Sequence, residues 1–94
     1  MWNMEIRHDE GRRRFVADVD GGEAYLSYEP AGTGRLDFES TFVPPMARGH
    51  GVGARLVMAG FAFARSQGCR VIPTCSFVQR VIRDHPEYEA LIEA

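Results

Sequence analysis

Three glycines stand at alternate positions of one segment, at Gly49, Gly51 and Gly53, and Arg48 comes directly before them. The apolar residues that follow recur at helical spacing, so the segment leads into a helix. A helix N-terminus presents N–H groups without acceptors and a partial positive charge, and glycines let such a backbone approach a phosphate closely. Arg48 adds a permanent charge. We therefore predict an anion-binding turn over residues 48–54.

Two well-known phosphate-binding motifs do not account for this turn. A P-loop needs Lys and then Ser or Thr after its last glycine, whereas Ala54 and Arg55 follow Gly53 and the chain has no Lys. A Rossmann fingerprint should follow the first strand of a parallel sheet and precede an acidic residue by about 20 positions. Here several strand-like segments come first, and no carboxylate lies near residue 74.

Cys75 is a second candidate for chemistry, because it stands just before a segment with helical periodicity. A thiol at a helix N-terminus has its thiolate favoured by the dipole, so Cys75 is a candidate nucleophile; the alternative is a small buried packing residue. Cys69 is assigned to packing. The extended segment between the two cysteines spans roughly 20 Å, which favours two thiols over a disulfide. A zinc site would need more ligands than these thiols and a distant His85, so no metal is expected.

The first half of the chain has the pattern of a sheet. Apolar residues alternate with polar ones in four segments, Met4–His8, Phe15–Val19, Ala24–Tyr28 and Leu36–Phe42. Such alternation is typical of strands with one buried face, and glycine-containing turns separate the segments, which predicts an antiparallel four-stranded meander. In the fourth segment the alternation places Leu36, Phe38, Ser40 and Phe42 on one face, and Glu39 and Thr41 on the other.

The second half has helical periodicity. Pro44 and Pro45 end the sheet pattern, residues 52–64 form an amphipathic helix, and Gly68 suits its C-terminus. Val71 and Ile72 form a short strand, expected to pair parallel to the fourth strand. A second helix begins near residues 74–76 and turns its apolar side inward, with Phe77, Val78, Val81 and Ile82. The fold class is therefore α+β: an antiparallel four-stranded meander, a helix, a parallel strand and a C-terminal helix.

Size and charge narrow the function. With 94 residues the chain is expected to form a single domain over residues 1–94, too small for a two-lobed dinucleotide enzyme. A net charge of −2 argues against nucleic-acid binding. No apolar run approaches the ~18 residues of a membrane span, and the N-terminal segment lacks the apolar run of a secretory signal. We therefore expect a cytoplasmic protein without membrane contacts.

Four ordered segments together resemble a known family. Arg48-x-x-Gly51-x-Gly53, placed after an antiparallel strand and before an amphipathic helix, is similar to the pyrophosphate-binding turn of the GNAT superfamily of acetyl-CoA-dependent N-acetyltransferases. Residues 42–45 (FVPP), 71–78 (VIPTCSFV) and 84–88 (DHPEY) add a resemblance to the small YjdJ-type group of that superfamily. The resemblance covers nearly the whole chain.

The resemblance implies a shortened GNAT-like fold that binds acetyl-CoA as its cofactor. The residues expected to hold it are Phe42, Val43, Arg48, Gly49, His50, Gly51, Val52, Gly53 and Ala54. The implied function is transfer of an acetyl group to an unidentified amine. The short turn Asp9–Gly11 replaces the helices that build an acceptor pocket in other members, so the open site suits an amine on a protein or peptide, or is completed by another subunit. The alternative function is a non-catalytic CoA-binding or acyl-CoA-binding module.

The chain departs from the group at two positions that bear on catalysis. Ser40 stands where the group commonly has a His before Thr41, and Phe77 stands where it commonly has Tyr. Amine acetylation needs a proton acceptor and a proton for the leaving thiolate, and neither replacement supplies one. Glu39 is a poor substitute base, because the alternation places it opposite Ser40. Cys75 therefore remains as the candidate catalytic residue.

Overall fold

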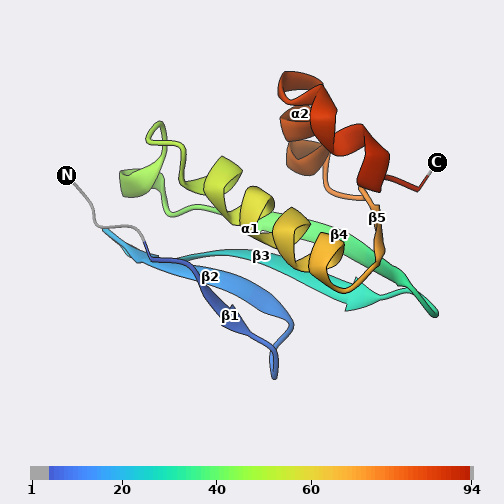
Figure 1. Ribbon diagram of the computed structural model, residues 1–94. Helices are drawn as coiled ribbons and strands as arrows, with labels where there is room; N and C mark the ends of the chain where they lie inside the picture. Colours follow the sequence, from blue (N-terminus) through green and yellow to red (C-terminus); the bar gives the residue numbers. More distant parts are fainter. Residues whose placement is uncertain (1–4, 94) are drawn as a thin grey trace.

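The protein folds around one mixed sheet, seen in a computed structural model that describes residues 5–93. Its strands are β1 (Arg7–Asp9), β2 (Arg14–Val19), β3 (Gly22–Pro30), β4 (Arg35–Phe42) and β5 (Arg70–Ile72), in the spatial order β1-β2-β3-β4-β5 (Figure 1). The first four pair antiparallel, and β5 pairs with β4 in parallel. The predicted meander and parallel strand are therefore confirmed. Met4, placed by the sequence in the first strand, lies outside the described residues.

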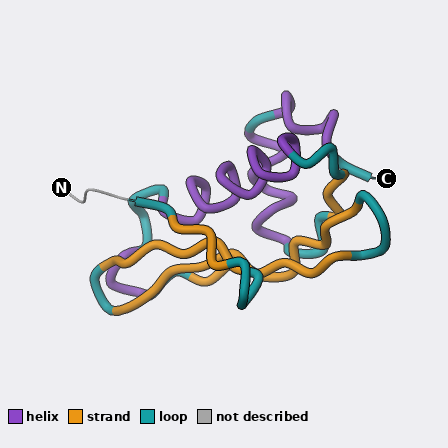
Figure 2. Tube along the Cα trace, turned by 60° about the horizontal axis from the view of Figure 1, so that its bottom comes forward, coloured by secondary structure: helices purple, strands orange, loops and turns teal. Residues whose placement is uncertain are grey.

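Two α-helices lie on the same side of this sheet (Figure 2). They are α1 (Val52–Ser66), which connects β4 to β5, and α2 (Ser76–Asp84), which follows β5 and packs against β4 and α1. Short 3₁₀ segments, η1 (Pro45–Ala47) and η2 (Pro86–Leu91), precede α1 and follow α2. Within the described residues, no helix is long and apolar enough to cross a membrane.

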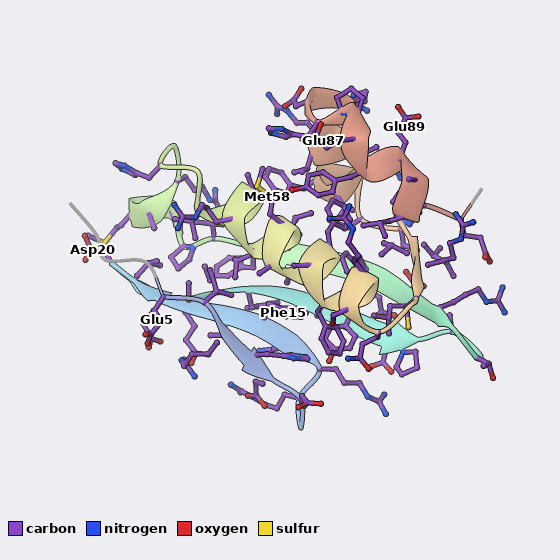
Figure 3. The ribbon with its side chains drawn as sticks, in the orientation of Figure 1. Glu5, Phe15, Asp20, Met58, Glu87 and Glu89 are labelled. Atoms are coloured by element: carbon purple, nitrogen blue, oxygen red, sulfur yellow. The ribbon has the colours of Figure 1, made fainter. Side chains whose placement is uncertain are left out.

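The apolar side of α1 sets how closely the helix approaches the sheet. Leu56, Val57 and Phe61 are fully buried against it. A Cβ at Gly60 would lie 2.8 Å from a methyl group of Leu26 and 2.9 Å from the ring of Phe38, so only glycine fits the helix this close. Figure 3 shows the side chains that fill the layer between sheet and helix.

A cluster of aromatic side chains, formed by His8, Phe15, Tyr28 and Phe63, packs near the C-terminal end of α1. The ring of Phe63 lies 4.4 Å from His8 and 5.8 Å from Phe15, measured between centroids. His8 Nε2 is 2.5 Å from the hydroxyl of Tyr28. Burial raises the pKa of Tyr28, so its phenol stays protonated at neutral pH and can donate to the imidazole. This cluster lies at the opposite end of α1 from the glycine-rich turn.

Strand β4 contains a bulge that changes which side chains face the helices. Ser27 pairs with Ser40 and Tyr28 pairs with Phe38, so Glu39 is an extra residue without a partner. The alternation therefore reverses after Glu39. Thr41 pairs with the buried Leu26 and lies on the helix side of the sheet, with Phe38.

The predicted face of Ser40 is wrong for the same reason. Ser40 lies on the opposite side of the sheet from Phe38, where its hydroxyl is 2.9 Å from that of Ser27. Phe42 also lies on that side, with its ring 5.7 Å from Tyr25. An extra residue in one strand leaves no mark in the apolar pattern, so period-two alternation could not reveal the switch.

Candidate functional site

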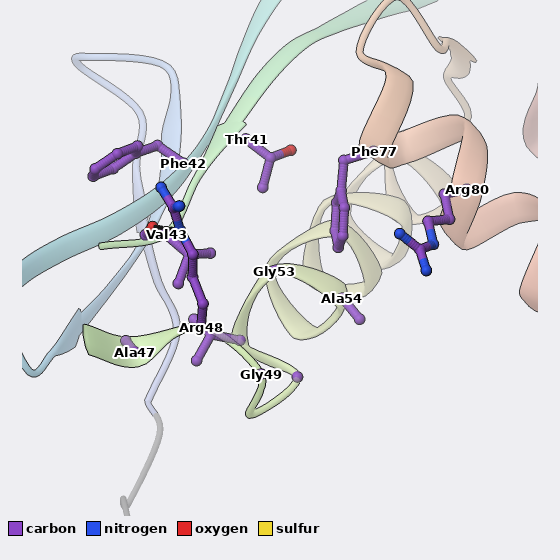
Figure 4. A pocket seen from close by; sticks show the side chains of 12 residues that line it. Thr41, Phe42, Val43, Ala47, Arg48, Gly49, Gly53, Ala54, Phe77 and Arg80 are labelled. Carbon is purple, nitrogen blue, oxygen red and sulfur yellow. Dashed lines mark hydrogen bonds between the residues drawn. The ribbon is translucent and has the colours of Figure 1, made fainter. Parts of the chain in front are cut away.

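A cavity of about 500 Å³ opens between the end of β4, the turn into α1, and the first turn of α2 (Figure 4). The residues that line it are Thr41, Phe42, Val43, Ala47, Arg48, Gly49, Gly51, Val52, Gly53, Ala54, Phe77 and Arg80. The set contains no acidic residue and two arginines. The cavity is therefore apolar along its walls and positively charged at Arg48 and Arg80.

The structure brings together eight of the nine residues expected to hold the cofactor, and His50 is the one outside the lining. His50 is exposed in the turn. Four further residues, Thr41, Ala47, Phe77 and Arg80, line the cavity and were not among those expected to hold the cofactor. The spacing of Phe77 and Arg80 puts them on one side of α2, but only the packing of α2 on β4 shows that this side meets the glycine-rich turn.

The N-terminus of α1 has no side-chain cap hydrogen bond from its N-cap residue. That residue is Gly51, with φ +78°, and as a glycine it has no side chain that could cap the helix. Its carbonyl accepts the first helical bond, from the N–H of Arg55 at 3.1 Å. The helix thus offers no acceptor to the N–H groups of Val52, Gly53 and Ala54. No acidic residue stands in the first turn, so the positive end of the dipole is not neutralised by the helix itself.

Two glycines shape this turn in different ways. Gly49 has φ +84° and Gly51 has φ +78°, backbone conformations that most side chains disfavour. Gly53 lies within the helix instead, where an added Cβ would lie 2.9 Å from the ring of Phe77. Phe77 therefore packs directly on the first turn of α1, and the absence of a side chain at Gly53 permits the contact.

Arg48 is anchored to the end of β4. Its Nε donates a hydrogen bond of 2.8 Å to the carbonyl of Val43, and its side chain is exposed (Figure 4). The guanidinium thereby ties the glycine-rich turn to the strand that forms the opposite wall. The sequence analysis expects Arg48 to contribute its charge and to help hold the cofactor, and the hydrogen bond to Val43 adds a positioning role.

Strands β4 and β5 stop pairing before they reach the cavity. Their pairing covers only Arg35–Asp37 of β4, and the N–H of Cys75 donates to the carbonyl of Phe38 at 3.0 Å just beyond it. From there β4 continues to Phe42, paired only with β3. The edge of β4 that faces the cavity is therefore open for main-chain hydrogen bonds with an extended molecule.

Cys75 is the N-cap of α2, as the sequence predicted, and its side chain is half-buried. Its Sγ lies 3.5 Å from the hydroxyl of Thr41. Thr41 lines the cavity, whereas Cys75 is not among the lining residues. Cys69 and Cys75 are both free thiols. Among residues 5–93, no three His, Cys, Asp or Glu side chains gather closely enough to hold a metal ion.

Comparisons with known proteins agree with this architecture. Residues 14–91 match the family model of the GCN5-related N-acetyl-transferases. Protein NATD1 of Bos taurus is 31% identical over 85 residues, which cover 88% of this chain and 75% of that protein. Protein NATD1 of Gallus gallus is 29% identical, over 88% of this chain and 77% of that protein. A GCN5-like protein of Staphylococcus aureus, solved in solution, is 25% identical and superposes with a TM-score of 0.77, covering 100% of this chain and 92% of that one.

Proposed function

The chain belongs to the family of GCN5-related N-acetyltransferases, and from this premise we propose that it binds acetyl-CoA in the cavity and transfers the acetyl group to an amine. One observation carries the proposal. The N-terminus of α1, which has no side-chain cap, and the open edge of β4 line the same cavity, and no acidic residue lines it with them.

The residues present fit acetyl-CoA part by part. The N–H groups of residues 52–54 suit its pyrophosphate, because a helix N-terminus binds anions. The open edge of β4 near Phe42 and Val43 suits the amides of the pantetheine arm, and Phe77 offers an apolar wall to its methylene groups. Acetyl-CoA supplies the acetyl group as an activated thioester.

We propose Cys75 as the nucleophile of the transfer. Its sulfur lies at the N-terminus of α2, and the hydroxyl of Thr41, 3.5 Å away, can donate to it. The sulfur would attack the thioester carbonyl, its new bond to the acetyl carbon replacing the bond to coenzyme A, which leaves as a thiolate and takes a proton from solvent. A neutral acceptor amine would then take the acetyl group, lose its extra proton to water and restore the Cys75 thiolate.

The acceptor side of the site supports a macromolecular amine. A short turn, residues 10–13, connects β1 directly to β2, so within the described residues no helix builds a wall there. Ser40 lies on the far side of the sheet from Thr41, so a histidine at this position would not face Cys75 either. We therefore propose an amine on a protein or peptide, which would bring its own surroundings to the open site.

A calorimetric titration of the purified protein with acetyl-CoA tests the binding part of the proposal. We expect one site per chain, with weaker binding at higher ionic strength because phosphates are held partly by charge. S-acetylpantetheine, which lacks every phosphate, is expected to bind far more weakly. A folded protein that takes up no acetyl-CoA would overturn the proposed function.

The contact between the hydroxyl of Thr41 and the sulfur of Cys75 predicts that Thr41 affects the reactivity of this thiol. In a Cys69→Ser background, Thr41→Val is expected to slow alkylation of Cys75 by iodoacetamide at neutral pH about tenfold, because one hydrogen bond to the thiolate is lost. Thr41→Ser keeps the hydroxyl and is expected to restore the rate. Equal rates for the Val and Ser variants would show that the hydroxyl does not act on the sulfur.

A further inference from the structure

We propose that Arg80 binds a phosphate group of coenzyme A in the cavity. It thereby makes the protein prefer ligands that carry the nucleotide end of coenzyme A over pantetheine, which lacks it. The inference rests on the proposed function and adds a specificity residue to it. Arg80 lies three positions after Phe77 on α2, so both side chains project from one side of that helix. Both line the cavity, and Figure 4 shows the guanidinium beside the Phe77 ring, on the side of Ala54.

Within residues 5–93, no acidic side chain pairs with Arg80. The other arginines that make polar contacts pair with carboxylates, as Arg35 does with Glu93 at 2.9 Å, or with main-chain carbonyls, as Arg48 does with Val43. Among the described residues, the side chain of Arg80 makes no hydrogen bond or ion pair. No Asp or Glu lines the cavity that it faces.

Three positive features therefore meet in this cavity: the free N-terminus of α1, Arg48 and Arg80. Like charges brought together repel one another, and an anion in the cavity would relieve that repulsion. The α1 N-terminus already offers N–H groups for one phosphate group. Arg80, on the α2 wall, is placed to bind a second phosphate or the outer oxygens of the first.

A guanidinium matches a phosphate through two parallel N–H donors, and the match is best for a terminal phosphate with several free oxygens. Coenzyme A carries one such group, the 3′-phosphate of its ribose, besides the bridging pyrophosphate. Arg80 could therefore bind either the 3′-phosphate or the pyrophosphate of coenzyme A. Ligands that lack one or both of these groups distinguish the two possibilities.

Arg83 provides a matched control for Arg80. It lies three residues further along α2 and is exposed like Arg80, but it lines a different cavity, of about 340 Å³, together with Glu89. Substituting glutamine in either position removes the charge while keeping a polar side chain and a similar helix propensity. Neither side chain is buried, so both variants are expected to keep the thermal midpoint of the wild type.

The experiment compares Kd values for CoA, 3′-dephospho-CoA and pantetheine by calorimetry at one low ionic strength. Arg80→Gln is expected to weaken CoA binding about tenfold, the size of one lost charged contact, and to leave pantetheine unchanged. A loss seen with CoA but not with 3′-dephospho-CoA assigns Arg80 to the 3′-phosphate. An equal loss with both assigns it to the pyrophosphate. Arg83→Gln should stay within about twofold of the wild type throughout.

Two outcomes would overturn the inference while leaving the proposed function intact. In the first, wild-type protein binds CoA and Arg80→Gln binds it equally well. In the second, Arg83→Gln loses as much affinity as Arg80→Gln, so that only general surface charge matters. Failure of the wild-type protein to bind CoA would instead refute the proposed function itself.

Discussion

Replacing Cys75 by alanine is expected to reduce acetyl transfer by ~10²-fold or more, because the group that takes up the acetyl is removed. Acetyl-CoA binding should change little, since Cys75 is not among the residues that line the cavity. The effect is therefore expected in the rate of the chemical step and not in the affinity for the acetyl donor.

The first half of the reaction can be measured without knowing the acceptor. Incubation with acetyl-CoA alone should add one acetyl group to the wild-type protein, and intact-protein mass spectrometry followed by peptide mapping should place it on Cys75. Cys75→Ala should remain unmodified. Cys69→Ala is the matched control, and this variant should still be acetylated. Cys69 directly precedes β5, and its sulfur lies 3.9 Å from the carbonyl oxygen of Gln67.

The contrary outcomes lead to different conclusions. Acetyl transfer by Cys75→Ala at the wild-type rate would mean that the amine attacks the thioester directly and that Cys75 only packs. A wild-type protein that binds acetyl-CoA, carries no acetyl group afterwards and releases no CoA with a broad set of amines would be a CoA-binding module.

The sequence was sufficient to predict the elements, because their signals are local. Period-two alternation predicted the strands, and helical periodicity predicted α1. Gly68 ends α1 as expected: it has φ +66°, its N–H bonds the carbonyl of Arg65, and the N–H of Cys69 bonds that of Ala64.

The parts that could not be predicted depend on contacts between distant segments. The bulge at Glu39 decides that Thr41, and not Ser40, faces Cys75, and its only trace is the pairing of β4 with β3. Likewise, Phe77 and Arg80 belong to the cavity because α2 packs on β4 beside the first turn of α1. Local pattern therefore identified the glycine-rich wall, whereas tertiary packing was needed to find the wall that faces it.

A carboxylate at Gly51 is expected to weaken the binding of acetyl-CoA about 100-fold while leaving the fold intact. Gly51 has φ +78°, which Asn and Asp tolerate better than other residues, and an added Cβ would meet no atom within 4 Å. Gly51→Asn and Gly51→Asp thus have the same shape and the same backbone cost, and differ by one charge. Any difference between them measures the electrostatics of the site.

The two variants should separate stability from binding. The negative charge of Gly51→Asp lies at the positive end of α1, which favours its folded state by about 0.3–1 kcal/mol relative to Gly51→Asn. The same charge repels the phosphates of the acetyl donor, so its Kd should rise about 100-fold above that of Gly51→Asn, and added salt should narrow the gap. Thermal unfolding and calorimetry measure the two effects. Equal affinity in both variants would show that the α1 N-terminus holds no anion. An Asp variant that is more stable but binds acetyl-CoA much more weakly would support the proposal. It would show that the missing side-chain cap at Gly51 lowers the stability of the fold and leaves the helix N-terminus available to the ligand.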